Sequence, residues 1–134
     1  MRKTNRKQQR TIHFRSTKCG DILCVHDQAA KAYADLLEKD DTVARYAVNV
    51  PLENKQYGYI YQTGIRADYF DIGWTTDFLI TQQDGSLRVR ELVQERMLGK
   101  LAVREQLELS RRYWASKGVS DWKAIMAGLV GGEM

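Results

Sequence analysis

Two strand-like runs flank a short polar turn near the middle of the sequence. The first run covers residues 75–82, the second covers residues 87–94, and the turn between them contains Asp84 and Gly85. An Asp-Gly turn between two such runs is a strong signal for a β-hairpin. We therefore predict two adjacent antiparallel strands, around which the other elements have to fit.

A helix is predicted on each side of this hairpin in the chain. Residues 27–41 repeat their apolar side chains at spacings of three and four, with Asp27 as the N-cap. Residues 98–117 show the same periodicity over a longer stretch, and Gly118 follows where a left-handed C-terminal cap is favoured. Each helix therefore has one face that should pack against a sheet.

The remaining elements are predicted to be strands and loops. Because a helix separates residues 87–94 from the last strand, those two strands should run parallel with a right-handed crossover. The predicted fold class is therefore α/β, with a mixed β-sheet flanked by helices. The segments are a hairpin at 11–27 turning at Gly20 and Asp21, a strand at 42–52, an edge or ribbon strand at 56–65, a loop at 66–73 and a strand at 121–126.

Composition indicates one globular domain. The chain has 134 residues, of which 43% are hydrophobic and 28% charged, as in ordinary folded proteins. No apolar run approaches the roughly 18 residues of a membrane span, and the N-terminus lacks the apolar segment of a signal peptide. These features predict a soluble cytoplasmic protein that makes no membrane contact.

Two cysteines and two histidines lie close together near the N-terminus. His13, Cys19, Cys24 and His26 contain ligand types that bind zinc, but their spacing matches no familiar zinc motif. The alternative is a pair of reduced cysteines in or near the first hairpin, as expected in the cytoplasm.

The positive charge is concentrated at the N-terminus. The net charge is +4, with 21 basic and 17 acidic residues. Residues 1–18 contain seven basic residues and no acidic residue, so their net charge is +7. The rest of the chain has 21 − 7 = 14 basic and 17 acidic residues, so its net charge is −3. Such an arm is suited to phosphate backbones of nucleic acid through counterion release, and the alternative is a solvated, frayed terminus. Its basic residues are Arg2, Lys3, Arg6, Lys7, Arg10, Arg15 and Lys18.

The central hairpin carries two carboxylates in positions that should otherwise be buried. Asp77 and Glu91 lie on neighbouring predicted strands, where a matched face would let them converge. Two converging carboxylates can hold Mg²⁺ or Mn²⁺, which activates water for phosphodiester hydrolysis. The alternatives are a salt bridge to Arg88 or Arg90, or a solvated strand end.

The three tryptophans are expected to have a packing role. Trp74, Trp114 and Trp122 fall at strand ends and on the long helix, so they indicate core packing and not base stacking. The alternating Tyr57, Tyr59 and Tyr61 of the predicted ribbon strand are weaker candidates for DNA contact.

The order of motifs resembles a known family. "WTTDFLITQQDGSLRVRELV" is followed by "LELSRRYWASKGVSDWKAIM", and "AYADLLEKDDTVARYAVNVPL" lies upstream. Over residues 19–127 this pattern is similar to the catalytic domain of TnsA, the endonuclease subunit of heteromeric bacterial transposases. The resemblance implies a restriction-endonuclease-like fold with a PD-(D/E)xK site. With the basic arm (1–18) predicted from charge and a flexible tail (128–134) predicted from its glycine-rich sequence, the resemblance leaves residues 19–127 as a nuclease-like core.

The resemblance assigns site residues and implies partners. The family's sheet aspartate falls on Asp77, and the acidic residue of its (D/E)xK motif falls on Glu91. As catalytic residues these two would bind Mg²⁺ or Mn²⁺ for cleavage of DNA at transposon ends. The implied partners are DNA and a separate transposase or another protein subunit.

This chain departs from the family pattern at two positions. The lysine position holds Val93, or Gln94 after a shift of one, and the helix glutamate falls on Ala29 or Ala30. Loss of a fixed positive charge from such a site commonly costs on the order of 10²–10³ in rate. The candidates for substitute groups are Lys100, Arg104, Asp27 and Asp68.

Three functions therefore stay open at this point. The first is an active endonuclease subunit in DNA transposition. The second is a catalytically degraded nuclease-fold protein that binds DNA or a protein partner, as a regulator or inhibitor from a mobile element or phage. The third is an unrelated small binding domain.

Overall fold

The structure is a computed structural model, and it describes residues 11–128. Four strands form one mixed sheet in the order β3-β4-β5-β6, and β1 pairs with β2 in a separate two-stranded sheet. The predicted mixed α/β architecture is thereby confirmed. The elements are β1 (Ile12–Ser16), β2 (Asp21–Val25), α2 (Gln28–Lys39), β3 (Val43–Pro51), η1 (Asn54–Tyr59), α3 (Ala67–Ile72), β4 (Thr75–Gln82), β5 (Leu87–Val93), η2 (Glu95–Gly99), α4 (Leu101–Ser116) and β6 (Asp121–Met126), where η marks a 3-10 helix.

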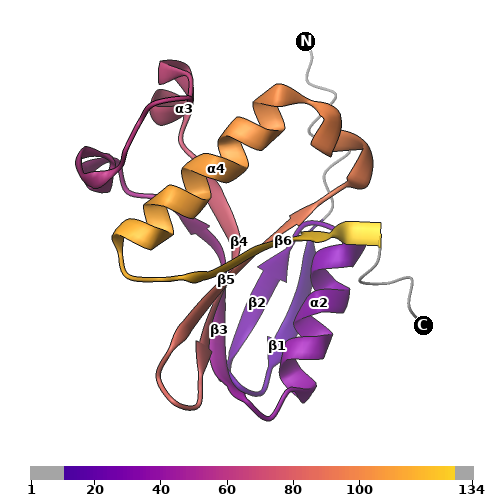
Figure 1. Cartoon of the computed structure of the whole chain (residues 1–134). Helices are drawn as coiled ribbons and strands as arrows, with labels where there is room; N and C mark the ends of the chain where they lie inside the picture. The colour runs from indigo at the N-terminus through magenta and orange to yellow at the C-terminus, as the bar shows by residue number, and fades with distance from the viewer. Residues whose placement is uncertain (1–10, 129–134) are drawn as a thin grey trace.

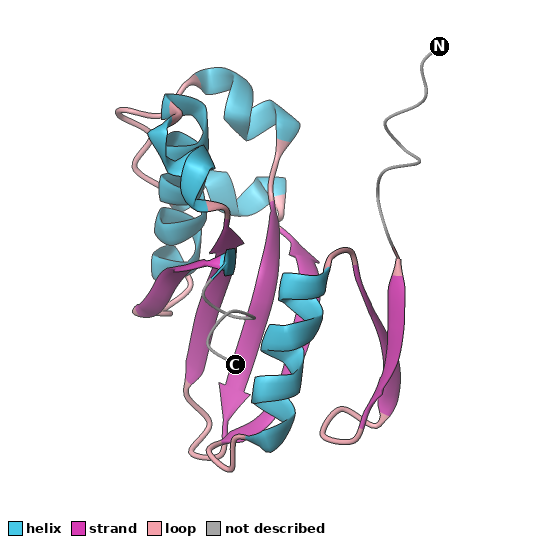
Figure 2. Ribbon diagram, turned by 90° about the vertical axis from the view of Figure 1, so that its right-hand side faces the viewer, coloured by secondary structure: helices cyan, strands magenta, loops and turns pink. Residues whose placement is uncertain are grey.

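The helices cover both faces of the four-stranded sheet. Figure 1 shows α4 crossing the sheet diagonally, and the turned view of Figure 2 shows α2 on the opposite side with the β1–β2 hairpin beyond it. The expected flexible tail at 128–134 lies outside the described residues except for Gly128. Within residues 11–128, none of the helices combines the length and the apolar character that crossing a bilayer requires.

The central hairpin and the crossover are as predicted. β4 and β5 pair antiparallel, with Phe78 opposite Arg90 and Leu79 opposite Val89. β5 and β6 pair parallel, as a helical crossover between them requires. Gly118, which follows α4, has a φ of +90° and supplies the left-handed residue that ends the helix.

Two apolar cores lie on opposite faces of the sheet. Because side chains alternate along β4 and β5, consecutive residues point into different cores. The α4-side core contains Leu52, Tyr57, Ile60, Ile65, Tyr69, Val89, Leu109, Tyr113, Trp114 and Val119. The α2-side core contains Ala34, Leu37, Val43, Tyr46, Phe78 and Ile80.

Strand β3 changes the face that it presents at one residue. Val48 packs against the α2-side core, whereas Val50, two residues later, packs against the α4-side core. Between them Asn49 adopts a φ of +53°, a left-handed conformation that asparagine tolerates better than most residues. Its side-chain amide donates to the carbonyl of Cys24 at 2.9 Å, which fixes this turn of the strand against β2.

Strand β4 makes the matching change beside Asn49. Phe78 belongs to the α2-side core, but Thr76 accepts a hydrogen bond from Trp114 of α4 at 2.8 Å. Val48 pairs with Phe78 and Val50 with Thr76, so β3 and β4 change the face that they present at the same level of the sheet. We call this change of face the roll of β3 and β4. Asp77 lies between Thr76 and Phe78, where β4 makes the change.

The prediction of a strand at residues 56–65 is wrong. The segment starts within η1 and continues as a loop, and Tyr57 is buried while Tyr59 and Tyr61 are exposed. Tyr57 and Ile60, three residues apart, both enter the α4-side core, which is the period of a 3-10 helix. The alternating tyrosines therefore did not mark a strand. The predicted loop at 66–73 also contains a helix, α3.

The β1–β2 hairpin is predicted correctly and is fastened to α2 and β3. The hydroxyls of Ser16 and Tyr46 both donate to the carboxylate of Glu38. The ammonium of Lys18 donates to the carbonyl of Val43 at 2.8 Å. Residues 12–18 of the basic segment are thus part of the folded domain.

We expect Asp27→Ala to destabilise the protein by about 1 kcal/mol, because the Asp27 carboxylate caps α2. It accepts a hydrogen bond from the backbone N–H of Ala30 at 2.8 Å. Urea unfolding at neutral pH measures the change. Asp35→Ala, which removes only an exposed ion pair with Lys31, should cost about 0.5 kcal/mol or less. Equal losses in the two variants would contradict the capping role.

Candidate functional site

Asp77 and Glu91 lie next to each other on adjoining strands, as their predicted positions required. The β4–β5 ladder ends at the pair Phe78 and Arg90. Asp77 immediately precedes Phe78 in the chain, and Glu91 immediately follows Arg90. The backbone N–H of Asp77 donates to Glu91 Oε1 at 3.1 Å, and the N–H of Leu92 donates to Asp77 Oδ2 at 2.7 Å. The two carboxyl groups therefore accept the backbone hydrogen bonds that continue the ladder.

Glu91 is fully buried and is held by side chains from three elements or their ends. Its relative exposure is 0%. Glu91 Oε2 accepts hydrogen bonds from Trp74 Nε1 at 2.9 Å, Thr76 Oγ1 at 2.9 Å and Ser110 Oγ at 2.6 Å. With the N–H of Asp77, four donors converge on this carboxylate, which compensates much of the cost of its burial.

Two further tryptophans support this first set of donors. Trp114 Nε1 donates to Thr76 Oγ1 at 2.8 Å, and Trp122 Nε1 donates to Ser110 Oγ at 3.0 Å. Each hydroxyl thus receives one hydrogen bond and donates one to Glu91. The packing role predicted for the tryptophans is confirmed, and sequence reasoning did not foresee their indole N–H groups as partners of a buried carboxylate.

Burial and mutual repulsion make the acidic pair hard to ionise fully. Burial and then the negative charge of Glu91 raise the pKa of Asp77 to about 7, with a smaller contribution from Asp27, while the N–H of Leu92 opposes the rise. Burial also raises the pKa of Glu91, against the effect of its hydrogen-bond donors. Near neutral pH the pair is therefore partly protonated and carries less than two negative charges.

The alternative in which arginines neutralise the two carboxylates is wrong. Arg90 Nη1 lies 2.9 Å from an oxygen of Asp121, and Arg88 Nη2 lies 3.8 Å from an oxygen of Asp40. Phe78 and Arg90 are register partners, so Arg90 projects from the face opposite to Glu91 by strand alternation.

No basic side chain occupies the place expected for the family's lysine. Val93 is buried, with 7% exposure, and Gln94 is exposed beyond the end of β5. Of the proposed substitutes, Asp27 caps α2 and contributes to the raised pKa of Asp77, whereas Asp68 is exposed on α3.

Within residues 11–128, neither the histidines and cysteines of the first hairpin nor the acidic pair forms part of a metal-binding cluster of three or more ligands. In that range no three or more histidine, cysteine, aspartate or glutamate side chains are arranged to hold a metal ion. Cys19 Sγ donates to the carbonyl of Tyr46 at 3.1 Å, and Cys24 lies opposite His13 in the β1–β2 ladder. Both cysteines are free thiols.

Two of the seven predicted phosphate-contacting residues of the arm lie in the described part. Arg15 is exposed on β1, while Lys18 is partly buried and donates to Val43. The described fold therefore leaves Arg15 available for an anion and gives Lys18 a structural hydrogen bond. The others, Arg2, Lys3, Arg6, Lys7 and Arg10, lie outside the described residues.

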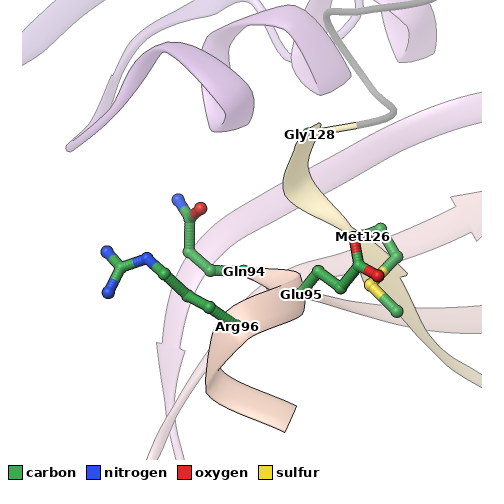
Figure 3. Close-up of a pocket in the computed structure, with 5 residues that line it drawn as sticks. All are labelled: Gln94, Glu95, Arg96, Met126 and Gly128. Carbon is green, nitrogen blue, oxygen red and sulfur yellow. The ribbon is translucent and has the colours of Figure 1, made fainter.

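A pocket of about 490 Å³ opens beyond the carboxyl ends of β5 and β6. Figure 3 shows Glu95 turned toward Met126, with Gln94 and Arg96 turned to the other side. Gly128 completes the lining. The first residue of its lining, Gln94, comes two residues after Leu92, whose N–H donates to Asp77. The pocket is therefore close to the acidic pair along the chain.

Comparison of the chain with protein-family models and with curated protein sequences gives no match.

We expect Asp77→Asn to reduce the pH dependence of stability. The pKa of Asp77 rises from an ordinary 3.8 to about 7 on folding, so the folded protein holds more protons than the unfolded chain between these values. The free energy of unfolding should therefore fall as pH rises from about 4 to about 7. The asparagine variant should lose most of this slope and, at pH 8, be more stable than the unaltered chain by up to about 4 kcal/mol.

Urea unfolding at half-unit steps from pH 4.5 to pH 8 provides the measurement. Asp71→Asn, which replaces an exposed aspartate of α3, is the control and should keep the original slope. A slope in Asp77→Asn as steep as that of the unaltered protein would show that Asp77 does not hold the proton.

Proposed function

We propose that this chain is a TnsA-like component of a DNA transposition system that binds DNA without cutting it. The proposal gives the domain a restriction-endonuclease-like core in which the acidic pair maintains structure. The observation that carries it is the state of Glu91, which is fully buried and already accepts hydrogen bonds from four protein donors.

A carboxylate that already accepts several buried hydrogen bonds is a poor ligand for a hard cation. Each carboxylate oxygen has two lone pairs; Glu91 Oε2 accepts from three donors, whereas Oε1 accepts only from the N–H of Asp77. Bidentate binding of Mg²⁺ or Mn²⁺, or binding at Oε2, would displace Trp74, Thr76 or Ser110 and leave that group without its buried acceptor, at a cost of roughly 1–3 kcal/mol for each. The pair also offers less than its full negative charge near neutral pH, because the pKa of Asp77 is about 7.

The lysine position supports the same proposal. In a PD-(D/E)xK site the lysine supplies positive charge near the attacking water, and Val93 cannot do so. With an apolar side chain there and a partly protonated acidic pair, the charge that normally stabilises a phosphorane is missing. DNA binding would instead rest on basic residues, including the N-terminal arm, with a transposase or another protein subunit supplying the cleavage.

A second candidate is an active Mg²⁺- or Mn²⁺-dependent endonuclease with Asp77 and Glu91 as ligands. One observation favours it: the two carboxyl groups lie close enough for the charge of Glu91 to raise the pKa of Asp77. A divalent cation would offset this repulsion and could replace the retained proton. The metal would then activate water for hydrolysis of a DNA phosphodiester.

We expect the chain to leave supercoiled plasmid intact in about 5 to 10 mM Mg²⁺ or Mn²⁺, to the same extent as Asp77→Ala, because the lysine is absent and Glu91 Oε2 is already occupied by three buried donors. Agarose-gel separation of supercoiled and nicked plasmid measures the outcome. Nicking by the unaltered chain that Asp77→Ala lacks would overturn the proposal and establish the endonuclease instead.

Val93→Lys is the matched control for this assay. It restores the family's residue without touching the two carboxylates, so nicking gained by Val93→Lys and abolished again in Asp77→Ala/Val93→Lys would assign the missing activity to position 93. The melting temperature of each variant shows that the protein under assay is folded.

We expect deletion of residues 1–10 to weaken DNA binding and to flatten its salt dependence. The deletion removes five of the seven basic residues of the arm and leaves β1 intact. The slope of log K against log salt should fall by about 0.9 for each phosphate that the protein no longer neutralises. Fluorescence anisotropy with a labelled duplex measures the slope, and an unchanged slope would exclude phosphate binding by the arm.

A control distinguishes charge from chain length. A full-length variant with Arg2, Lys3, Arg6, Lys7 and Arg10 replaced by glutamine keeps the length of the arm and removes the same charge. It should behave as the deletion does. Binding that is abolished in the deletion and retained in the glutamine variant would contradict an electrostatic role.

A further inference from the structure

The segment that joins β5 to α4 carries three exposed basic side chains at intervals of four residues. Arg96 lies in η2, Lys100 is the N-cap residue of α4, and Arg104 lies in its first turn. All three are exposed. The N–H of Arg104 donates to the carbonyl of Lys100 at 3.2 Å, so these two residues are successive along one side of the helix start.

These three cations lack the acidic partners that most arginines elsewhere in the described chain possess. Within residues 11–128, none of the three forms an ion pair or a side-chain hydrogen bond. By contrast, Arg66, Arg88, Arg90, Arg111 and Arg112 each lie within 4.0 Å of a carboxylate oxygen. The charge of the segment is therefore directed to solvent and available to an external anion.

The basic segment adjoins a concave surface. Arg96 lines the pocket beyond β5 and β6 together with Gln94 and Met126, and its guanidinium extends away from Glu95 (Figure 3). The pocket therefore presents an amide and a guanidinium on one side of η2. Lys100 and Arg104 continue the positive charge from the pocket along the start of α4.

We propose that Arg96, Lys100 and Arg104 form a second phosphate-contacting surface, which holds a DNA backbone across the end of the sheet. The proposal rests on the DNA-binding function proposed above, and it places a binding surface on the folded core in addition to the N-terminal arm. We call these three residues the η2–α4 surface.

The chemistry of the surface favours a phosphate backbone over other anions. Its three charges occur within nine residues of the chain, and a backbone presents a regular series of phosphates, which an array of separate cations can follow. The exposed position keeps the side chains hydrated, so the interaction depends on charge and should be strongly sensitive to salt. The surface carries no arrangement of groups that would select a base sequence.

The test measures binding of a labelled duplex across roughly 50 to 300 mM salt with the triple variant Arg96→Gln/Lys100→Gln/Arg104→Gln. We expect the slope of log K against log salt to fall by about 0.9 for each phosphate left without its cation, and thus by up to about 2.7. Binding should be weaker than that of the unaltered chain throughout this range.

Two control variants isolate position from total charge. Lys39→Gln/Lys55→Gln/Lys123→Gln removes the same charge from exposed residues of α2, η1 and β6 and should change the slope by less than about 0.5. Arg96→Lys/Lys100→Arg/Arg104→Lys keeps every charge and should retain the original slope. All substituted side chains in the three variants are exposed, and thermal melts verify that each variant is folded.

The outcomes separate this inference from the proposed function. If the unaltered chain binds DNA and the triple variant keeps its slope, the η2–α4 surface is excluded while the DNA-binding function stands. Equal effects of the two charge-removing variants would also overturn the inference, because they would reflect net charge alone. Absence of DNA binding by the unaltered chain would overturn both.

Discussion

The hydrogen bonding of the Glu91 carboxylate is the interaction on which the domain depends most. A fully buried charge is costly unless it is surrounded by donors, and here the donors come from the approach to β4, from β4 itself and from α4. The same groups that solvate Glu91 therefore fix α4 to the sheet. Removing a single donor would disturb both the charge and the packing, because Trp114 and Trp122 hold the hydroxyls of Thr76 and Ser110 in place.

The roll of β3 and β4 makes this arrangement geometrically feasible. Without the left-handed conformation of Asn49, strict alternation would direct Val50 and Thr76 to the α2-side core, away from α4. The change of face instead brings Thr76 beneath Trp114 and leaves Asp77 at the transition, where its carboxyl accepts the N–H of Leu92. The acidic pair thus makes hydrogen bonds between β4 and β5 just beyond the last paired residues of their ladder, which gives both carboxylates a structural role.

The distribution of charge connects this structural role to the proposed function. Acidic groups next to a DNA backbone repel it unless a cation or a proton neutralises them. In this protein the raised pKa of Asp77 lowers the charge of the pair near neutral pH, and the unpaired cations of the η2–α4 surface lie further along the same chain segment. Under the proposed function, exposed cations of the core bind a phosphate backbone while the acidic pair, with Glu91 fully buried, takes no part in metal-dependent cleavage.

The sequence by itself determined the central hairpin, the two long helices, the crossover and the proximity of Asp77 to Glu91. The Asp84-Gly85 turn, the helical periodicity of 98–117 and the crossover fix which strands are neighbours, because these are short-range or topological constraints. Tertiary structure decided the remainder. Residues 56–65 do not form a strand, because the α4-side core takes up Tyr57 and Ile60, three residues apart, while Tyr59 and Tyr61 stay exposed. The donors of Glu91 combine residues 74, 76 and 77 with Ser110 of α4, and no local spacing relates Ser110 to the other three.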